Sequence, residues 1–169
     1  MMQVLFSHGK ESGPWGGKIK RLASVAEQLG WGVDSIDYRD LLDPDDRVQR
    51  LVEHGLKYAE PLVLCGSSMG GYASVCASQQ VKPAGVFLLA PALSLPGYQH
   101  PSPALVCEQR CIVHGWTDDV VPVEHVIRYA QADNIPLMLM PDGHRLLDSM
   151  DLIAQLFRDF LTRIVPPQA

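Results

Sequence analysis

Cysteines are few in this sequence, and none of them has metal-binding spacing. The chain contains four, Cys65, Cys76, Cys107 and Cys111, and no C-x-x-C pair. We therefore expect neither a zinc site nor a disulfide framework. Reduced and mostly buried thiols are predicted instead, which is typical of a cytoplasmic protein.

The sequence also lacks long apolar runs and an excess of positive charge. No apolar stretch approaches the length of a transmembrane helix. The opening residues, MMQVLFSHGK, contain no basic region followed by a long apolar segment, so no signal peptide is expected. The formal net charge is -5, which does not suggest nucleic acid or an anionic membrane as a partner.

Short apolar runs are present, and they alternate with segments of helical periodicity. With 169 residues, of which 47% are hydrophobic, the chain is long enough for one domain over residues 1–169 with a substantial core. The expected strands are residues 3–6, 32–37, 61–65, 84–90, 110–115 and 135–140. Six strands that alternate with helices predict an α/β protein, in which a parallel sheet is connected by right-handed crossovers. Ligands then bind at the carboxyl ends of the strands.

A serine framed by glycines follows the third expected strand. In the segment VLCGSSMGGYA, the residues Gly66, Ser68 and Gly70 form G-x-S-x-G, and the neighbouring Ser67 has no such frame. The pattern is typical of a nucleophile elbow, in which a strand turns abruptly into a helix and exposes a strained serine. A glycine-rich turn is the alternative interpretation, and the preceding strand favours the elbow.

A serine hydroxyl is a weak nucleophile at neutral pH and needs a histidine base and a carboxylate. In proteins with this elbow, the acid follows the serine and the histidine follows the acid. Among six histidines, His144 lies in the loop after the last expected strand, where a base is needed. The others come before the acid or lie within a helix: His8, His54, His100, His114 and His125. The acid is Asp118 or Asp119, which both follow the fifth strand.

These motifs together resemble those of small α/β-hydrolases. The segment HGWTDDVVP is similar to the H-G-x-x-D-x-x-V-P motif of that family, in which the aspartate is the triad acid. The resemblance assigns the acid to Asp118, the nucleophile to Ser68 and the base to His144. It covers nearly the whole chain and implies an α/β-hydrolase fold with a six-stranded, mostly parallel sheet, helices on both faces and a short lid.

Two backbone amides are needed to stabilise an oxyanion. We assign one to Met69, because it follows the nucleophile and begins a helix whose dipole assists. The segment SHGKESGP resembles the family's H-G loop, which implies the amide of Lys10 as the second. Structural hydrogen bonding beneath the site is predicted for His8 and His114, and a core position for Cys65.

The segment expected to form the lid is short and rich in proline. Residues 91–109 contain four prolines and a glycine, which oppose a long helix. We therefore predict that no helical cap covers Ser68 and that the site is open to small or exposed acyl groups. Trp15 and Trp116 lie in loops at the edge of the site, where they either pack or line an acyl pocket.

The expected function is that of a serine hydrolase which cleaves a carboxylic ester through an acyl-enzyme intermediate. Its partner is a small-molecule acyl substrate, and no metal or organic cofactor is expected. A thioesterase or an amidase would use the same residues with a different leaving group. A non-catalytic binding module that kept the fold is the remaining alternative, and the ordered Ser, Asp and His residues argue against it.

Overall fold

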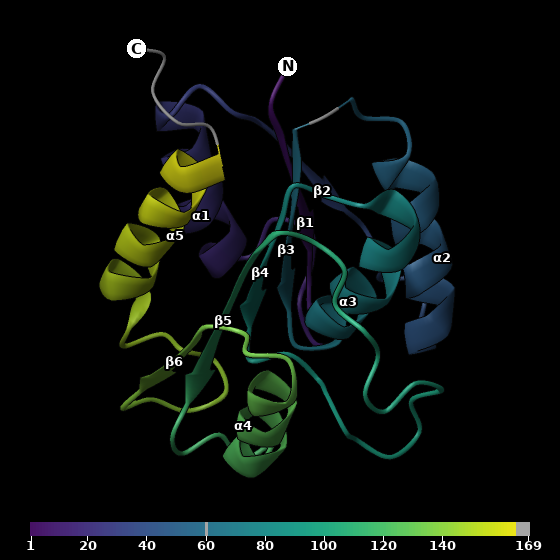
Figure 1. The fold of residues 1–169 in the computed structure, drawn as a ribbon, viewed down its shortest axis with the longest axis vertical. Coiled ribbons are helices and arrows are strands. Elements are labelled where there is room, and N and C mark those ends of the chain that lie inside the picture. Colours follow the sequence, from purple (N-terminus) through teal and green to yellow (C-terminus); the bar gives the residue numbers. More distant parts are fainter. Residues whose placement is uncertain (60, 165–169) are drawn as a thin grey trace.

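The structure of the protein is a computed structural model, which describes residues 1–59 and 61–164. Strands and helices alternate along the described chain (Figure 1). The elements are β1 (Gln3–Ser7), α1 (Gly17–Gln28), β2 (Gly32–Ile36), α2 (Pro44–Gly55), β3 (Leu62–Ser67), α3 (Met69–Val81), β4 (Gly85–Leu89), β5 (Gln109–Gly115), α4 (Val123–Ala132), β6 (Leu137–Met140) and α5 (Met150–Ile164).

The strands form one sheet in the order β2-β1-β3-β4-β5-β6. Every neighbouring pair is parallel, which confirms the predicted α/β fold and makes the described sheet wholly rather than mostly parallel. The chain adds β2 on one side of β1 and then crosses to β3 on the other side. The strand order therefore reverses between β1 and β3, and ligands bind beside such a reversal at the carboxyl ends of the strands.

Helices cover both faces of the sheet, as expected. In Figure 1, α1 and α5 lie on one face, whereas α2 and α3 lie on the other. Successive residues of β3 point to opposite faces: Leu62 and Leu64 join the core beneath α2 and α3, while Val63 and Cys65 join the core beneath α1 and α5. A central strand that is buried on both faces must be apolar throughout, which explains the continuous run before Ser68.

The connection between β4 and β5 contains no helix. Residues 91–108 form neither helix nor strand, which confirms the prediction that no helical cap is present. The segment is nevertheless anchored, because the Ala92 amide donates to the Ser68 carbonyl at 2.9 Å and the Tyr129 hydroxyl donates to the Pro103 carbonyl at 2.7 Å. None of the helices in the described part of the chain is long and apolar enough to cross a membrane.

Candidate active site

Ser68 lies at the sharp turn between β3 and α3. Its backbone angles are φ 53° and ψ -117°, a conformation that costs energy for any residue other than glycine. Main-chain hydrogen bonds hold it there: the Ser68 amide donates to the Leu89 carbonyl at 2.9 Å, and the Ser68 carbonyl accepts from Gly71 at 2.9 Å. The geometry is that of the predicted elbow.

The two glycines of the frame are required by close approach of the backbone. A β-carbon at Gly66 would collide with the carbonyl of Gly70, and one at Gly70 would collide with the carbonyl of Ser7. The strand, the helix and the end of β1 therefore come together around Ser68 at distances that only glycine permits.

Three predicted residues from three separate loops form a continuous hydrogen-bonded chain. His144 Nε2 lies 3.0 Å from Ser68 Oγ, and His144 Nδ1 lies 2.8 Å from Asp118 Oδ2. Because an ionised carboxylate only accepts hydrogen bonds, the proton of the imidazole resides on Nδ1. Nε2 is then free to accept the proton of the Ser68 hydroxyl.

The Asp118 side chain is fully buried and tied to its own loop. Oδ1 accepts from the amides of Val120 at 2.9 Å and Val121 at 2.7 Å. Burial alone would raise the pKa of this carboxyl, but the hydrogen bonds from His144 and from the two amides hold it below its ordinary value. Asp118 is therefore ionised and fixed in place, whereas the neighbouring Asp119 is exposed.

A second histidine also contacts the carboxylate. His114 Nε2 lies 2.9 Å from the Val121 carbonyl and 3.2 Å from Asp118 Oδ2. A carbonyl accepts only, so Nε2 carries the proton, and burial lowers the pKa of His114 and keeps it neutral. The sequence predicted structural bonding for His114, but its contact with the acid could not be deduced from the motif spacing.

The loop that carries His144 is held against β5. Asp142 accepts from the amides of Gly143 at 2.8 Å and Ser149 at 3.0 Å, while its own carbonyl accepts from the Thr117 hydroxyl at 3.0 Å. The His144 side chain remains 18% exposed, and Ser68 is partly exposed. Solvent and substrate can thus reach the hydroxyl–imidazole pair.

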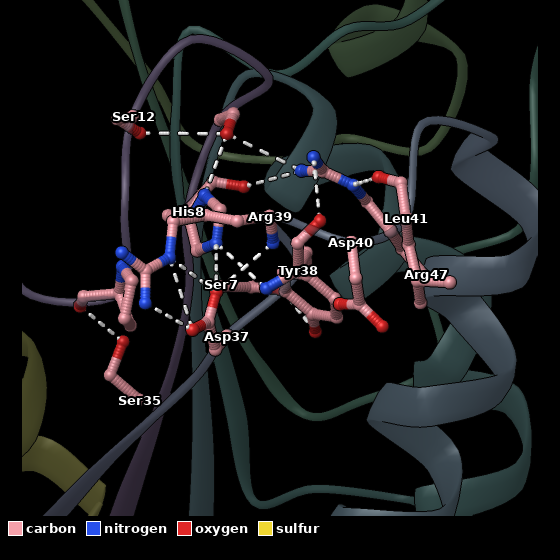
Figure 2. Close-up of polar contacts among 12 residues, drawn as sticks. Ser7, His8, Ser12, Ser35, Asp37, Tyr38, Arg39, Asp40, Leu41 and Arg47 are labelled. Atoms are coloured by element: carbon pink, nitrogen blue, oxygen red, sulfur yellow. Dashed lines mark hydrogen bonds and ion pairs between the residues drawn. The ribbon is translucent and has the colours of Figure 1, made fainter.

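The predicted oxyanion residues belong to two different segments next to the serine. Met69 is the first residue of α3, so its amide belongs to the positive end of the helix dipole. Lys10 follows Gly9, which lies next to the serine: a β-carbon added at Gly9 would lie 3.4 Å from Ser68 Cβ. His8 is buried beneath this loop, and its Nδ1 lies 2.7 Å from the Gly9 carbonyl (Figure 2).

The other singled-out residues have plainer environments. Cys65 is buried, and burial raises the pKa of its thiol well above the ordinary range, so it is an inert core residue as predicted. Trp15 and Trp116 are 42% and 54% exposed. Across the described residues, no cluster of three or more His, Cys, Asp or Glu side chains is arranged to hold a metal ion.

A cleft of about 630 Å³ lies elsewhere, between α2, α3 and residues 99–104. Its lining includes Asp45 and Cys76 but none of the three hydrogen-bonded residues described above. The hydroxyl–imidazole pair therefore does not line this cleft.

One relative with a solved structure is similar over almost the whole chain. It is a protein from Xanthomonas campestris pv. campestris assigned to the alpha/beta superfamily of hydrolases, which is 36% identical. The match covers 96% of this chain and 99% of that one, with a TM-score of 0.87. No match was found among curated proteins.

More distant structures share the fold. Est1E from Butyrivibrio proteoclasticus is 13% identical, with a TM-score of 0.80 over 97% of this chain and 88% of that one. A serine hydrolase without lid from Xanthomonas campestris is 17% identical, with a TM-score of 0.71 over 99% of this chain and 84% of that one. Residues 3–126 match the model of the Uncharacterised protein family UPF0227. The chain therefore belongs to the UPF0227 family and is a hydrolase of the alpha/beta superfamily.

Proposed function

We propose that this hydrolase cleaves a carboxylic ester by a covalent mechanism in which Ser68 is the nucleophile. The observation that carries the proposal is the hydrogen-bonded chain from Ser68 Oγ through His144 to Asp118, with distances of 3.0 and 2.8 Å. A hydroxyl, an imidazole and a buried carboxylate in this order supply a nucleophile, a general base and a group that fixes the tautomer of the base.

In the first half-reaction, Ser68 Oγ attacks the ester carbonyl carbon while its proton passes to His144 Nε2. The imidazolium that forms is stabilised by the ionised Asp118, whose pKa is lowered. The tetrahedral intermediate then collapses, the carbon–oxygen bond to the alcohol breaks, and His144 returns its proton to the departing alkoxide. The acyl group is left on Ser68.

The amides of Met69 and Lys10 are the groups that we assign to the oxyanion. Both belong to segments packed against Ser68, and one begins a helix. A single oxyanion-hole donor contributes a factor of about 10² to 10³ in kcat in a serine hydrolase. Water activated by His144 then attacks the acyl carbonyl and releases the acid, which regenerates the Ser68 hydroxyl.

The substrate that we propose is a small or exposed acyl ester. The absence of a helix in residues 91–108 and the partial exposure of Ser68 support an open site. Est1E and the lidless serine hydrolase are named for esterase and serine-hydrolase activity, which agrees with ester cleavage on this fold. A thioester or amide would be cleaved by the same steps, with a thiolate or amine as leaving group.

The domain organisation and the cellular location of the protein are part of the proposed function. We infer that residues 1–169 act as one catalytic domain, because residues 68, 118 and 144 meet at the edge of one sheet. Four free cysteines support the proposed cytoplasmic location. The mechanism uses only side chains and backbone amides, and it calls on no nucleic-acid or membrane partner.

A fluorophosphonate probe tests the nucleophile directly. We expect the wild-type protein to be labelled on the peptide that contains Ser68, the Ser68→Ala variant to resist labelling, and the Ser67→Ala variant to react as the wild type does. Ser67 is the matched control, because it is the adjacent serine at the end of β3. Persistent labelling of Ser68→Ala would remove the assignment, and an unreactive wild-type protein would favour a binding module.

A chain-length series then tests the substrate class. Hydrolysis of p-nitrophenyl esters with acyl chains of increasing length, compared with the matching thioesters and anilides, should show the highest kcat/KM for short oxygen esters. A preference for thioesters or anilides would shift the proposal to the alternative leaving group, and a strong preference for long chains would contradict the open, shallow site.

A further inference from the structure

The largest fully buried side chain in the described protein is an arginine. Arg47 lies in the first turn of α2 and is only 1% exposed. Its burial is costly for two reasons: a guanidinium loses its hydration, and a cation at a helix N-terminus faces the positive end of the helix dipole. Burial also lowers the pKa of Arg47.

The partners of this guanidinium are main-chain carbonyls. Its four hydrogen bonds reach the carbonyl oxygens of Leu41 at 3.0 Å, His8 at 3.1 Å, Gly9 at 3.3 Å and Tyr38 at 3.4 Å. The ring of Tyr38 lies beneath it, with 5.1 Å between the guanidinium carbon and the ring centroid. Figure 2 shows the side chain reaching from α2 toward the loop that contains His8.

The Gly9 carbonyl oxygen accepts hydrogen bonds from three donors, although a carbonyl oxygen has only two lone pairs. Besides Arg47 Nη1 at 3.3 Å, it accepts from His8 Nδ1 at 2.7 Å and from Ser12 Oγ at 3.5 Å. The tautomer of His8 is fixed, because Nε2 accepts from the Tyr38 amide at 2.9 Å and the proton therefore resides on Nδ1. Arg47 from α2 and His8 from the loop after β1 therefore both donate to this one carbonyl oxygen.

That carbonyl belongs to the same peptide unit as the Lys10 amide. A trans peptide is planar, and its C=O and N–H point in opposite directions. Groups that fix the Gly9 carbonyl therefore fix the direction of the Lys10 N–H. The Gly9 α-carbon lies next to Ser68, so the Gly9–Lys10 peptide is adjacent to the proposed nucleophile.

We propose that Arg47 is a positioning residue for the oxyanion hole, which acts through the Gly9–Lys10 peptide. The guanidinium holds the peptide so that the Lys10 N–H is aimed at the oxyanion, and its charge polarises the peptide and strengthens the N–H as a donor. The inference rests on the proposed function, since it assigns a cause to one of its oxyanion amides. It explains why a cation is buried where, among the described residues, no carboxylate is one of its hydrogen-bond partners.

The kinetic test compares Arg47→Met and Arg47→Lys with Arg50→Met. Arg50 is one turn further along α2, is 28% exposed and pairs with the Asp40 carboxylate at 2.6 Å, without touching the Gly9 carbonyl. With p-nitrophenyl acetate, we expect Arg47→Met to lower kcat about 10- to 100-fold with little change in KM. One oxyanion donor contributes about 10² to 10³ in kcat, and a misdirected amide loses part of that contribution. Arg47→Lys should fall between, and Arg50→Met should match the wild type.

A spectroscopic readout separates this role from a merely structural one. In ¹⁵N-labelled protein, formation of the fluorophosphonate adduct should move the Lys10 amide proton downfield. In Arg47→Lys this movement should shrink, while the corresponding movement of the Met69 amide stays as in the wild type. Equal loss at both amides, or no loss at Lys10 with a normal kcat, would overturn the proposal.

Folding of the variants does not limit the test. If Arg47→Met fails to fold, Arg47→Lys carries it, because lysine keeps the charge but not the planar fork that reaches several carbonyls. A folded Arg47→Lys protein with wild-type kcat and a wild-type Lys10 shift would contradict the inference alone. A wild-type protein that the fluorophosphonate does not label would instead overturn the proposed function and this inference with it.

Discussion

The chain places a His-Gly dipeptide at the carboxyl end of two different strands. His8-Gly9 follows β1, and His114-Gly115 ends β5. Both histidines are completely buried, and burial lowers the pKa of each. The two segments nevertheless serve opposite sides of the site, because the first packs on Ser68 and the second on Asp118.

The two imidazoles differ in tautomer and in what they hold. His8 has its proton on Nδ1 and uses both nitrogens on the backbone, with the Gly9 carbonyl and the Tyr38 amide as partners. His114 has its proton on Nε2, which contacts the Val121 carbonyl and the Asp118 carboxylate. Its Nδ1 has no hydrogen-bond partner among the described residues. One histidine therefore orients a peptide, and the other orients a carboxylate.

In the proposed mechanism, the same dipeptide supports both halves of the acyl-transfer machinery. A buried neutral histidine supplies directed hydrogen bonds without a buried charge, and the glycine after it lets another segment approach. Beside Ser68, the proposed role of these properties is to orient an amide toward developing negative charge. Beside Asp118, they secure the group that fixes the base. Breaking each segment should therefore give a different kind of defect.

The largest expected effect on turnover comes from changing Asp118, the carboxylate that His114 contacts. Asp118→Asn should lower kcat about 10⁴-fold, because an amide can occupy the same space and still favour the wrong tautomer of the base. The matched control is Asp119→Asn, since Asp119 is exposed in the same loop and should cost little. Turnover of any ester that the protein cleaves measures both; a crippled Asp119→Asn would place the acid one residue further on.

The sequence predicted where the strands lie along the chain, but it did not predict their order in the sheet. Each expected strand is present and helices alternate with the strands, because apolar periodicity is a local signal. The last strand starts later than predicted, at Leu137. The Ile135 amide is taken by the Ala130 carbonyl at the end of α4, and Pro136 has no amide to donate.

The candidate site was predicted unevenly for a similar reason. Ser68 and His144 follow from the glycine frame and from chain order, whereas the choice of Asp118 over Asp119 needed a family resemblance. Arg47 left no signal, because a charged residue in the first turn of a helix usually faces solvent. Its role depends on a carbonyl 38 positions away in sequence, and only the three-dimensional arrangement brings the two together.

A smaller effect should distinguish the two glycines. A β-carbon on Gly115 would collide with the carbonyl of Asp142 and lie 2.7 Å from that of Gly143, so Gly115→Ala must displace the loop that carries His144. We expect the unfolding free energy to fall by about 1–3 kcal/mol. Because a displacement of about 1 Å can lower a rate about 10²-fold, we also expect kcat to fall by about 10²-fold.

Gly9→Ala is the matched variant in the other segment. Its added methyl would lie 3.4 Å from Ser68 Cβ, which is ordinary contact, so the fold should tolerate it and the crowding should appear mainly as a higher KM. Urea unfolding and steady-state kinetics measure the pair. Equal loss of stability in both variants would contradict the asymmetry between the two segments.

The smallest expected effect is the acid sensitivity that the two histidines confer. Each has a lowered pKa in the folded protein, so below about pH 6.5 the unfolded chain becomes protonated at this histidine while the folded protein stays neutral there. Stability is therefore full above that pH and is lost as the pH falls. Asp118, whose pKa is also lowered, begins to contribute only below about pH 4, so a comparison of pH 7.5 with pH 5.5 isolates the histidines.

At pH 5.5 one such histidine accounts for at most about 1.4 kcal/mol of the loss. His8→Gln and His114→Gln should each reduce the difference in unfolding free energy between the two pH values, as measured by urea denaturation. We expect His8→Gln to reduce it more. Protonated His8 would face the cations of Arg47 and Arg39, with Asp37 as its counter-charge, whereas protonated His114 would be drawn to the Asp118 carboxylate and opposed only by His144. If His114→Gln flattens the profile more, the unpartnered Nδ1 of His114 outweighs the attraction of Asp118, and the two segments differ in the opposite sense.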